Sequence, residues 1–332
     1  MIAARPLAVS RELSGSRAVV TGGAGFIGSH LAAALADAGA SVRVLDNLRT
    51  GASSNILPSK TPVELVRTSL RPDDLDAALT GAQILFHCAA NAYVPPSVDR
   101  PQEDFDINVA LTLRLLEWFR RNAPETPIIL FSSAAVYGNP RRVPVDEDHP
   151  LDPISPYGVS KLAAERYGAV YAQLYAMPVC ALRCFAVYGP RQRKQVIYDL
   201  MLRMQAGRGA LRVLGDGTQV RDFCFVEDIA RAAIWVAERA PLRGEVFNVG
   251  SGRGVTTRDL VGAIGGALGL APAPTFTGAV RPGDPQAVVA DWSRLGRLGW
   301  SPRISLHRGL TRTAEWLAAS ESRFETSPAG AR

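Results

Sequence analysis

A tyrosine and a lysine stand four residues apart, at Tyr157 and Lys161, in a stretch whose apolar spacing predicts a helix. Residues four apart lie on the same helix face, so the phenol and the ammonium would be neighbours. The ammonium would favour phenolate, so that the tyrosine could exchange a proton well below its ordinary pKa of about 10. The chain has three lysines and eight tyrosines, and this is its only pair at that spacing. The alternative is a pair on a solvated helix surface.

A glycine-rich turn between a predicted strand and a predicted helix indicates a dinucleotide site. Gly22 permits the tight turn, Gly25 lets the backbone approach a pyrophosphate at the helix N-terminus, and Gly28 allows close helix packing. Asp46 follows Gly28 by 18 positions, at the end of a second predicted strand. Its carboxylate would bind ribose hydroxyls and repel a 2′-phosphate, which favours NAD. Arg49 nearby leaves NADP open.

These groups need a sheet whose carboxyl edge brings them together. Apolar runs predict strands at 17–21, 41–45, 84–88, 127–132, 179–185 and 246–249, and helices at 27–38, 104–121, 156–176 and 227–239. Strands that alternate with helices predict an α/β fold with a doubly wound parallel sheet of the Rossmann type.

Turn-rich sequence after residue 185 predicts a second, smaller α+β lobe, with substrate bound between the two lobes. We expect residues 15–185 to form the nucleotide-binding domain, with a return to it at about 222–250. Residues 186–221 and 251–317 would form the substrate-binding lobe, and residues 1–14 and 318–332 would be disordered tails.

Composition restricts the class of protein. The 332 residues are 47% hydrophobic and 20% charged, which predicts a soluble globular chain. The net charge of +6 comes from scattered arginines, without the basic or aromatic stripe of a nucleic-acid surface. We find no signal peptide and no apolar run long enough for a membrane span. The four cysteines lack metal-ligand spacing, so we expect no metal and a reducing, cytoplasmic location.

Several segments together resemble the extended short-chain dehydrogenase/reductase family, in particular its nucleotide-sugar 4-epimerases. The resemblance runs from about Arg17 to Trp316 and rests on residues 21–28, 46–47, 87–90, 132–138 and 155–161, and on residues 182–192, 215–223 and 281–284. It implies an enzyme that retains NAD, binds a nucleotide sugar, most simply a UDP-sugar, and moves hydride from C4 and back to the opposite face through a 4-keto intermediate.

The resemblance also implies roles for individual residues. The catalytic set would be Ser133, Tyr157 and Lys161. Cofactor contacts would come from Gly22, Gly25, Phe26, Ile27, Gly28, Asp46, Asn47, Leu70, Ala89, Ala90, Tyr157 and Lys161. Substrate contacts would come from Ser133, Tyr157, Arg193, Arg221, Arg281 and Asp284. Arg221 and Arg281 would neutralise the diphosphate, Asp284 would bind a ribose hydroxyl, and Arg193 could meet a carboxylate, as in glucuronate epimerases.

Other activities remain open on the sequence. Ala134 and Ala135 follow Ser133 where related dehydratases carry an acidic pair, so elimination is disfavoured. Ala186 replaces an asparagine that usually bonds substrate, and Ser69 replaces an aspartate beside adenine. The alternatives are a UDP-glucuronate or N-acetylhexosamine epimerase, another nucleotide-sugar oxidoreductase or dehydratase, and a non-catalytic NAD-binding regulator.

The resemblance implies a homodimer in which two helices pair across a twofold axis. The predicted helices 104–121 and 156–176 carry more apolar side chains than one sheet face needs: Leu111, Leu115, Trp118, Phe119, Leu162, Val170 and Leu174.

Overall fold

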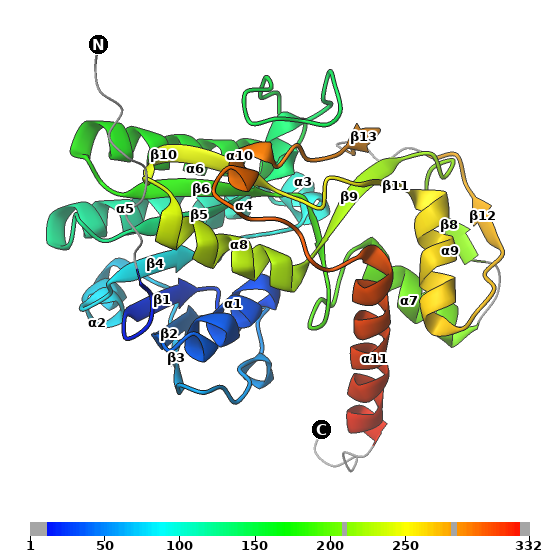
Figure 1. Cartoon of the computed structure of the whole chain (residues 1–332), viewed down its shortest axis with the longest axis horizontal. Coiled ribbons are helices and arrows are strands. Elements are labelled where there is room, and N and C mark those ends of the chain that lie inside the picture. Colours follow the sequence, from blue (N-terminus) through cyan, green and yellow to red (C-terminus); the bar gives the residue numbers. More distant parts are fainter. Residues whose placement is uncertain (1–11, 208–210, 280–283, 326–332) are drawn as a thin grey trace.

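The computed structural model describes residues 12–207, 211–279 and 284–325 of the chain. Its centre is a parallel sheet of seven strands in the order β10-β6-β5-β4-β1-β2-β3 (Figure 1). The strands are β1 (Arg17–Thr21), β2 (Ser41–Asp46), β3 (Val63–Arg67), β4 (Ile84–His87), β5 (Ile128–Ser133), β6 (Val179–Cys184) and β10 (Arg243–Val249). The α/β prediction is confirmed, because the six predicted strands occur within a few residues of their expected bounds.

Helices cover both faces of this sheet, as the apolar character of its strands requires. On one face α1 (Phe26–Asp37) packs against α8 (Val226–Arg239), and on the other α5 (Leu111–Asn122) packs beside α6 (Pro156–Tyr175) (Figure 1). Short helical segments link them: η1 (Ser53–Asn55), η2 (Pro72–Asp74), α2 (Leu75–Leu79), α3 (Val94–Asp99), η4 (Ala134–Tyr137) and α10 (Ser293–Gly296).

A smaller group of elements lies at the right of Figure 1, beyond the carboxyl end of the sheet. It contains β7 (Ala186–Tyr188), β8 (Leu211–Val213), β9 (Val220–Phe225), β11 (Gly254–Thr256), β12 (Pro274–Phe276) and β13 (Ala287–Val288), with α7 (Val196–Ala206), α9 (Thr257–Leu268) and α11 (Leu306–Glu325). Apart from β13, these elements share a separate apolar core, which includes Met201, Ile264 and Leu310. The exact domain boundaries stay a prediction.

The helix expected over 104–121 is interrupted. It consists of α4 (Pro101–Phe105), the π-helical turn η3 (Asp106–Ala110) and α5. The amide of Asn108 in η3 donates to the backbone carbonyl of Asn91 at 3.2 Å and to Ser160 Oγ at 2.9 Å. Contacts with distant residues therefore fix the wider turn, and local apolar spacing does not reveal it.

The two ends of the described chain are more ordered than expected. Leu13 is buried in the sheet core, although we expected residues 1–14 to be a tail. The expected tail from residue 318 is also wrong in part, because α11 continues to Glu325. Leu310 and Leu317 are buried, and a helix anchored in this way extends readily through the Ala, Ser and Glu residues that follow.

Candidate active site

A deep cleft of about 1100 Å³ runs along the carboxyl edge of the sheet. The cleft is lined by every described residue for which we expect a cofactor or substrate contact: Gly22, Gly25, Phe26, Ile27, Gly28, Asp46, Asn47, Leu70, Ala89, Ala90, Ser133, Tyr157, Lys161, Arg193, Arg221 and Asp284. Arg281 lies outside the described residues. The fold thus brings residues from distant parts of the chain to one site.

The glycine turn at one end of the cleft is as tight as the sequence predicts. Gly22 has a φ of +65°, and a Cβ there would lie 2.7 Å from the backbone of Ala89. A Cβ on Gly28 would lie 2.3 Å from the carbonyl oxygen of Gly22. Gly25 caps α1 without a side-chain hydrogen bond, so the first amides of the helix can bind an anion. The turn therefore fits the pyrophosphate of a dinucleotide.

Asp46 is fixed at the end of β2, where it faces the cleft. Its Oδ2 accepts from the backbone amide of Ala24 at 3.0 Å, and its Oδ1 accepts from that of Leu48 at 2.8 Å. The guanidinium of Arg49 is paired with the carboxylate of Glu103 in α4. The charge of Arg49 is therefore compensated, and the carboxylate of Asp46 disfavours a 2′-phosphate at this end.

The loop that carries Ala89 is positioned by a buried hydrogen-bond chain. The Ala89 amide donates to Thr21 Oγ1, which bonds His87 Nδ1 at 2.7 Å. His87 Nε2 lies 3.0 Å from Thr112 Oγ1, which itself donates to the carbonyl of Asn108. The only proton of the Thr112 hydroxyl is used in that second bond, so in the bond with His87 the threonine oxygen must be the acceptor. His87 therefore carries its proton on Nε2, and its Nδ1 accepts from Thr21. Burial lowers the pKa of His87 to about 3, so the ring stays neutral and structural.

Tyr157 and Lys161 occupy successive turns at the start of α6. Ser155 caps this helix by accepting from the Gly158 amide at 3.1 Å. Lys161 Nζ donates to the carbonyl of Phe131 in β5 at 2.6 Å. The phenol of Tyr157 is hydrogen-bonded to Ser133, two residues further along the same strand. The predicted catalytic set is thus assembled between α6 and β5.

The electrostatics of the pair differ from our expectation. Burial raises the pKa of Tyr157 to about 12, and the hydrogen bond with Ser133 only partly opposes this. Burial also lowers the pKa of Lys161 to about 8. The expected lowering of the phenol pKa by Lys161 is wrong for the protein alone, because desolvation dominates both groups. Cys184 and Asp104 act on both and raise both pKa values.

A buried acid beneath the site was missed in the sequence. Asp104 is 1% exposed, and it accepts from Asn91 at 3.0 Å, Asn108 at 3.1 Å and Ser160 Oγ at 2.6 Å. Ser160 lies between the two catalytic positions of α6, so this cluster ties that helix to η3. Polar residues four apart at 104 and 108, in an otherwise apolar helix pattern, were the available signal.

The far end of the cleft carries the predicted substrate residues. The Arg221 guanidinium in β9 pairs with the carboxylate of Asp284, although we expected these two to bind different parts of the nucleotide. Val288 in β13 is 6% exposed and lies opposite Arg221 in register. Ala186 and the exposed Arg193 also line the cleft. This end therefore combines apolar and cationic groups.

Two further kinds of feature are absent from the part of the chain that the structure describes. It holds no cluster of three or more His, Cys, Asp or Glu side chains that could bind a metal ion. None of its helices is both long and apolar enough to cross a lipid bilayer.

Comparison with known proteins gives consistent results. The model of the NAD dependent epimerase/dehydratase family matches residues 18–250. A protein of Methanocaldococcus jannaschii named as a putative UDP-glucose 4-epimerase is 35% identical over 308 residues, which cover 90% of this chain and 97% of that protein.

Two solved structures are also similar. The UDP-N-acetylglucosamine 4-epimerase of Methanobrevibacter ruminantium, in complex with UDP-N-acetylmuramic acid, has a TM-score of 0.86 and 32% identity, covering 92% of this chain and 99% of that one. The UDP-glucuronic acid 4-epimerase of Bacillus cereus, in complex with UDP-glucuronic acid and NAD, has a TM-score of 0.84 and 32% identity, with the same coverage.

Proposed function

The chain belongs to the NAD dependent epimerase/dehydratase family, and on that premise we propose that it is an NAD-dependent 4-epimerase of nucleotide-diphosphate sugars. The observation that carries this is the convergence of Ser133, Tyr157 and Lys161 in the cleft that begins at the glycine turn. Two of the similar proteins, which share about a third of their residues with this chain, are named as 4-epimerases of different UDP-sugars.

The cofactor is NAD. We infer that the amides after Gly25 would hold its pyrophosphate and that Asp46 would bind the adenosine ribose. Lys161 would reach the nicotinamide ribose from α6, and Ala89 and Ala90 would line the same side of the cleft. When bound, NAD supplies a hydride acceptor for C4 of the sugar and, in its oxidised form, a positive charge in the buried site.

Tyr157 is the proposed acid and base. Its phenolate removes the proton of the C4 hydroxyl and returns it to the oxygen of the 4-keto sugar after the sugar has turned over. Ser133 holds the phenol by a hydrogen bond and can bond the same sugar oxygen. Since burial raises the phenol pKa to about 12, the positive charge brought by the cofactor is needed to form phenolate near neutral pH.

Elimination is disfavoured at this site. Ala134 and Ala135 line the cleft directly after Ser133, and neither side chain can exchange a proton with the sugar. A dehydratase needs such a group to remove a proton and a hydroxyl from adjacent carbons. The site therefore favours epimerisation over dehydration.

The sugar is proposed to carry a larger or charged substituent. Val288 and Ala186 are small residues on the cleft wall. Epimerases that resemble this chain place at the position of Val288 a residue whose bulk limits the C2 substituent, whereas Ala186 adds space and removes the amide of the usual asparagine. Arg193 adds a cation that could meet a carboxylate. The similar proteins named for UDP-N-acetylglucosamine and UDP-glucuronic acid show that this fold serves both kinds of substrate.

Initial rates should therefore be higher with UDP-N-acetylglucosamine or UDP-glucuronate than with UDP-glucose. Inversion at C4 is followed by NMR with the purified holoenzyme. Val288→Tyr should lower the rate ratio of N-acetylglucosamine to glucose substrate by about tenfold, because the ring would fill the space of the acetamide. A clear preference of the wild type for UDP-glucose would contradict the proposal on the sugar. Steady accumulation of NADH without inversion would contradict the epimerase itself.

A homodimer is also part of the proposal, and it is supported by only some of the residues we expected, Val170 and Leu174 among them. Leu111, Leu115 and Phe119 are buried in the sheet core and cannot contribute to an interface. Exposed apolar side chains instead follow one stripe of α6: Val159, Tyr167, Val170 and Leu174, the last being 70% exposed. Their spacing of three to eight residues places them on one helix face, which a second copy of this chain would cover.

Light scattering at micromolar concentration should give twice the chain mass of 35.5 kDa. The double substitution Val170→Glu/Leu174→Glu should yield monomers, because it places charge in the centre of the stripe. Leu270→Glu is a matched control, since Leu270 is exposed but lies outside α6. A wild-type monomer would disprove the dimer.

A cytoplasmic location stays a prediction and rests on cysteine usage. Burial raises the pKa of the Cys184 thiol to about 12, so this group remains a neutral thiol in the sheet core. Buried thiols of this kind are typical of proteins from reducing compartments.

A further inference from the structure

The face of α6 that carries Tyr157 and Lys161 continues one turn further to Glu165. Each of these residues is bonded to one of three successive residues of β5. The first two bonds join Tyr157 to Ser133 and the Nζ of Lys161 to the backbone carbonyl of Phe131. The third is donated by Ser132 Oγ to Glu165 Oε2 at 3.0 Å. Helix and strand are thus held together at three consecutive turns, although Glu165 itself does not line the cleft.

Glu165 is in turn held by a buried arginine. Arg183 in β6 donates through Nε to Glu165 Oε2 at 3.0 Å and through Nη2 to Oε1 at 2.5 Å. The two side chains are 2% and 4% exposed. A bidentate pair allows the carboxylate only one orientation, so its Oε2 stays aimed at Ser132.

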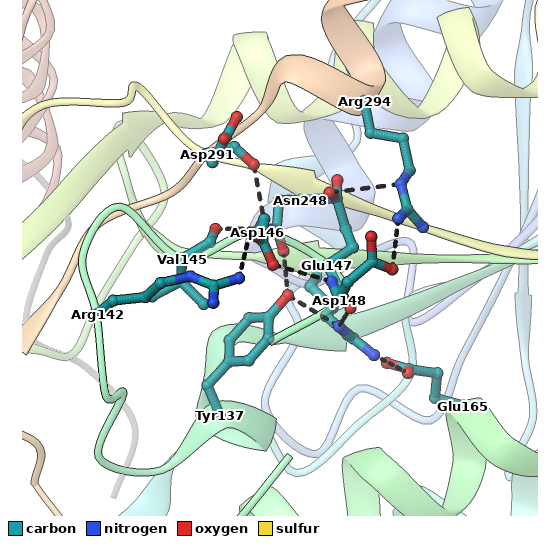
Figure 2. A network of polar contacts seen from close by, with 11 residues as sticks. Tyr137, Arg142, Val145, Asp146, Glu147, Asp148, Glu165, Asn248, Asp291 and Arg294 are labelled. Atoms are coloured by element: carbon teal, nitrogen blue, oxygen red, sulfur yellow. Dashed lines mark hydrogen bonds and ion pairs between the residues drawn. The ribbon is translucent and has the colours of Figure 1, made fainter. Parts of the chain in front are cut away.

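The remaining donor of Arg183 connects the pair to a wider network. Nη1 donates to Tyr137 Oη at 2.8 Å and to the carbonyl of Glu147 at 3.1 Å. Tyr137 donates to Asn248, whose amide reaches the carbonyls of Val145 and Asp291 (Figure 2). The pair is therefore bonded to groups of the protein itself, and neither Glu165 nor Arg183 lines the cleft.

We propose that Ser132, Glu165 and Arg183 are positioning residues that keep β5 and the catalytic face of α6 in register, so that Ser133 stays bonded to Tyr157. This proposal rests on the proposed function for its kinetic test. A purely structural role would not require an ion pair, because apolar residues can fill such a space with equal or greater stability.

Ser132→Ala in the NAD-loaded enzyme removes the contact with β5 and leaves the ion pair intact. We expect kcat to fall about tenfold or more, because small displacements of catalytic groups are costly. KM, bound NAD and Tm should stay close to wild type, and Ser132→Thr, which keeps the hydroxyl, should restore most of kcat. Thr313→Val is the control, since it removes a buried hydroxyl bond to Gly309 in α11, away from the cleft.

A second variant, Glu165→Leu/Arg183→Met, replaces the ion pair by apolar side chains of similar size. The proposal predicts a folded protein with a Tm near wild type and a kcat at least about tenfold lower. Full kcat in this folded variant, or in Ser132→Ala, would overturn it. If the double variant does not fold, Ser132→Ala decides the matter alone.

Titration of the tyrosine tests positioning without substrate. The phenolate of Tyr157 is followed by ultraviolet difference absorbance of the holoenzyme against Tyr157→Phe. The groups that face it are Ser133, which lowers its pKa, and Cys184 and Asp104, which raise it. Ser132→Ala should weaken the bond from Ser133 and so raise the pKa of Tyr157. If the pKa of Tyr157 is the same in Ser132→Ala as in the wild type, the proposal is overturned. If the pKa is shifted but the wild-type enzyme does not turn over any of the sugars, only the proposed function is contradicted.

Discussion

Tyr157→Phe is expected to lower kcat by at least about a hundredfold while NAD remains bound. The substitution removes only the phenolic oxygen, which is the group hydrogen-bonded to Ser133. The ring that remains fills the same space, so neither the fold nor the cofactor end of the cleft should change. Without the oxygen, the site loses the group that we propose accepts the C4 hydroxyl proton, and water would have to accept it.

The measurement is single-turnover and steady-state epimerisation, with NAD content determined by chromatography after heat denaturation. Tyr175→Phe is a matched control, because Tyr175 is exposed at the end of the same helix and is not part of the stripe proposed for the dimer. Turnover by Tyr157→Phe near the wild-type rate would refute the proposed acid–base role.

Lys161→Met is expected to reduce both turnover and cofactor retention. Methionine has a similar length but lacks the ammonium, which in the structure donates to the carbonyl of Phe131 and faces the cleft. A hydrogen bond from a charged group contributes about 1.5–3 kcal/mol, so NAD affinity should fall by about tenfold or more. Turnover should fall by about a hundredfold, because the phenolate loses a neighbouring cation.

The role of the Lys161 ammonium also predicts how NAD affinity changes with pH. Burial lowers the pKa of Lys161 to about 8, so the ammonium is present below that pH and is lost above it. NAD affinity of the cofactor-free wild type should therefore weaken as the pH rises through about 8, and that of Lys161→Met should not. Lys60→Met is the control, because Lys60 is exposed and does not line the cleft. Normal NAD binding by Lys161→Met would show that Lys161 acts on the tyrosine alone.

Features that depend on neighbouring residues could be predicted from the sequence. The turn at Gly22, the acid at Asp46 and the pair Tyr157 and Lys161 follow from local patterns of glycine, polarity and helical spacing. The order of strands and helices follows from the same patterns, because the apolar spacing of each element depends only on the residues of that element. The alternation of these elements then limits the sheet to a parallel one, and the carboxyl ends of its strands to one edge.

Features that depend on distant residues were decided only by the tertiary structure. Asn108 sits in a π-helical turn because Asn91 and Ser160 bind its side chain, and Glu165 faces Ser132 because Arg183 holds it. Each contact joins segments that no local pattern relates.

The protonation states of Tyr157 and Lys161 were likewise decided by the tertiary structure. The sequence shows an ammonium beside a phenol, but the pKa of each is set mainly by burial, which depends on everything packed around them. Local sequence thus determined which groups could take part in chemistry, whereas long-range packing and desolvation decided their orientation, their partners and their protonation.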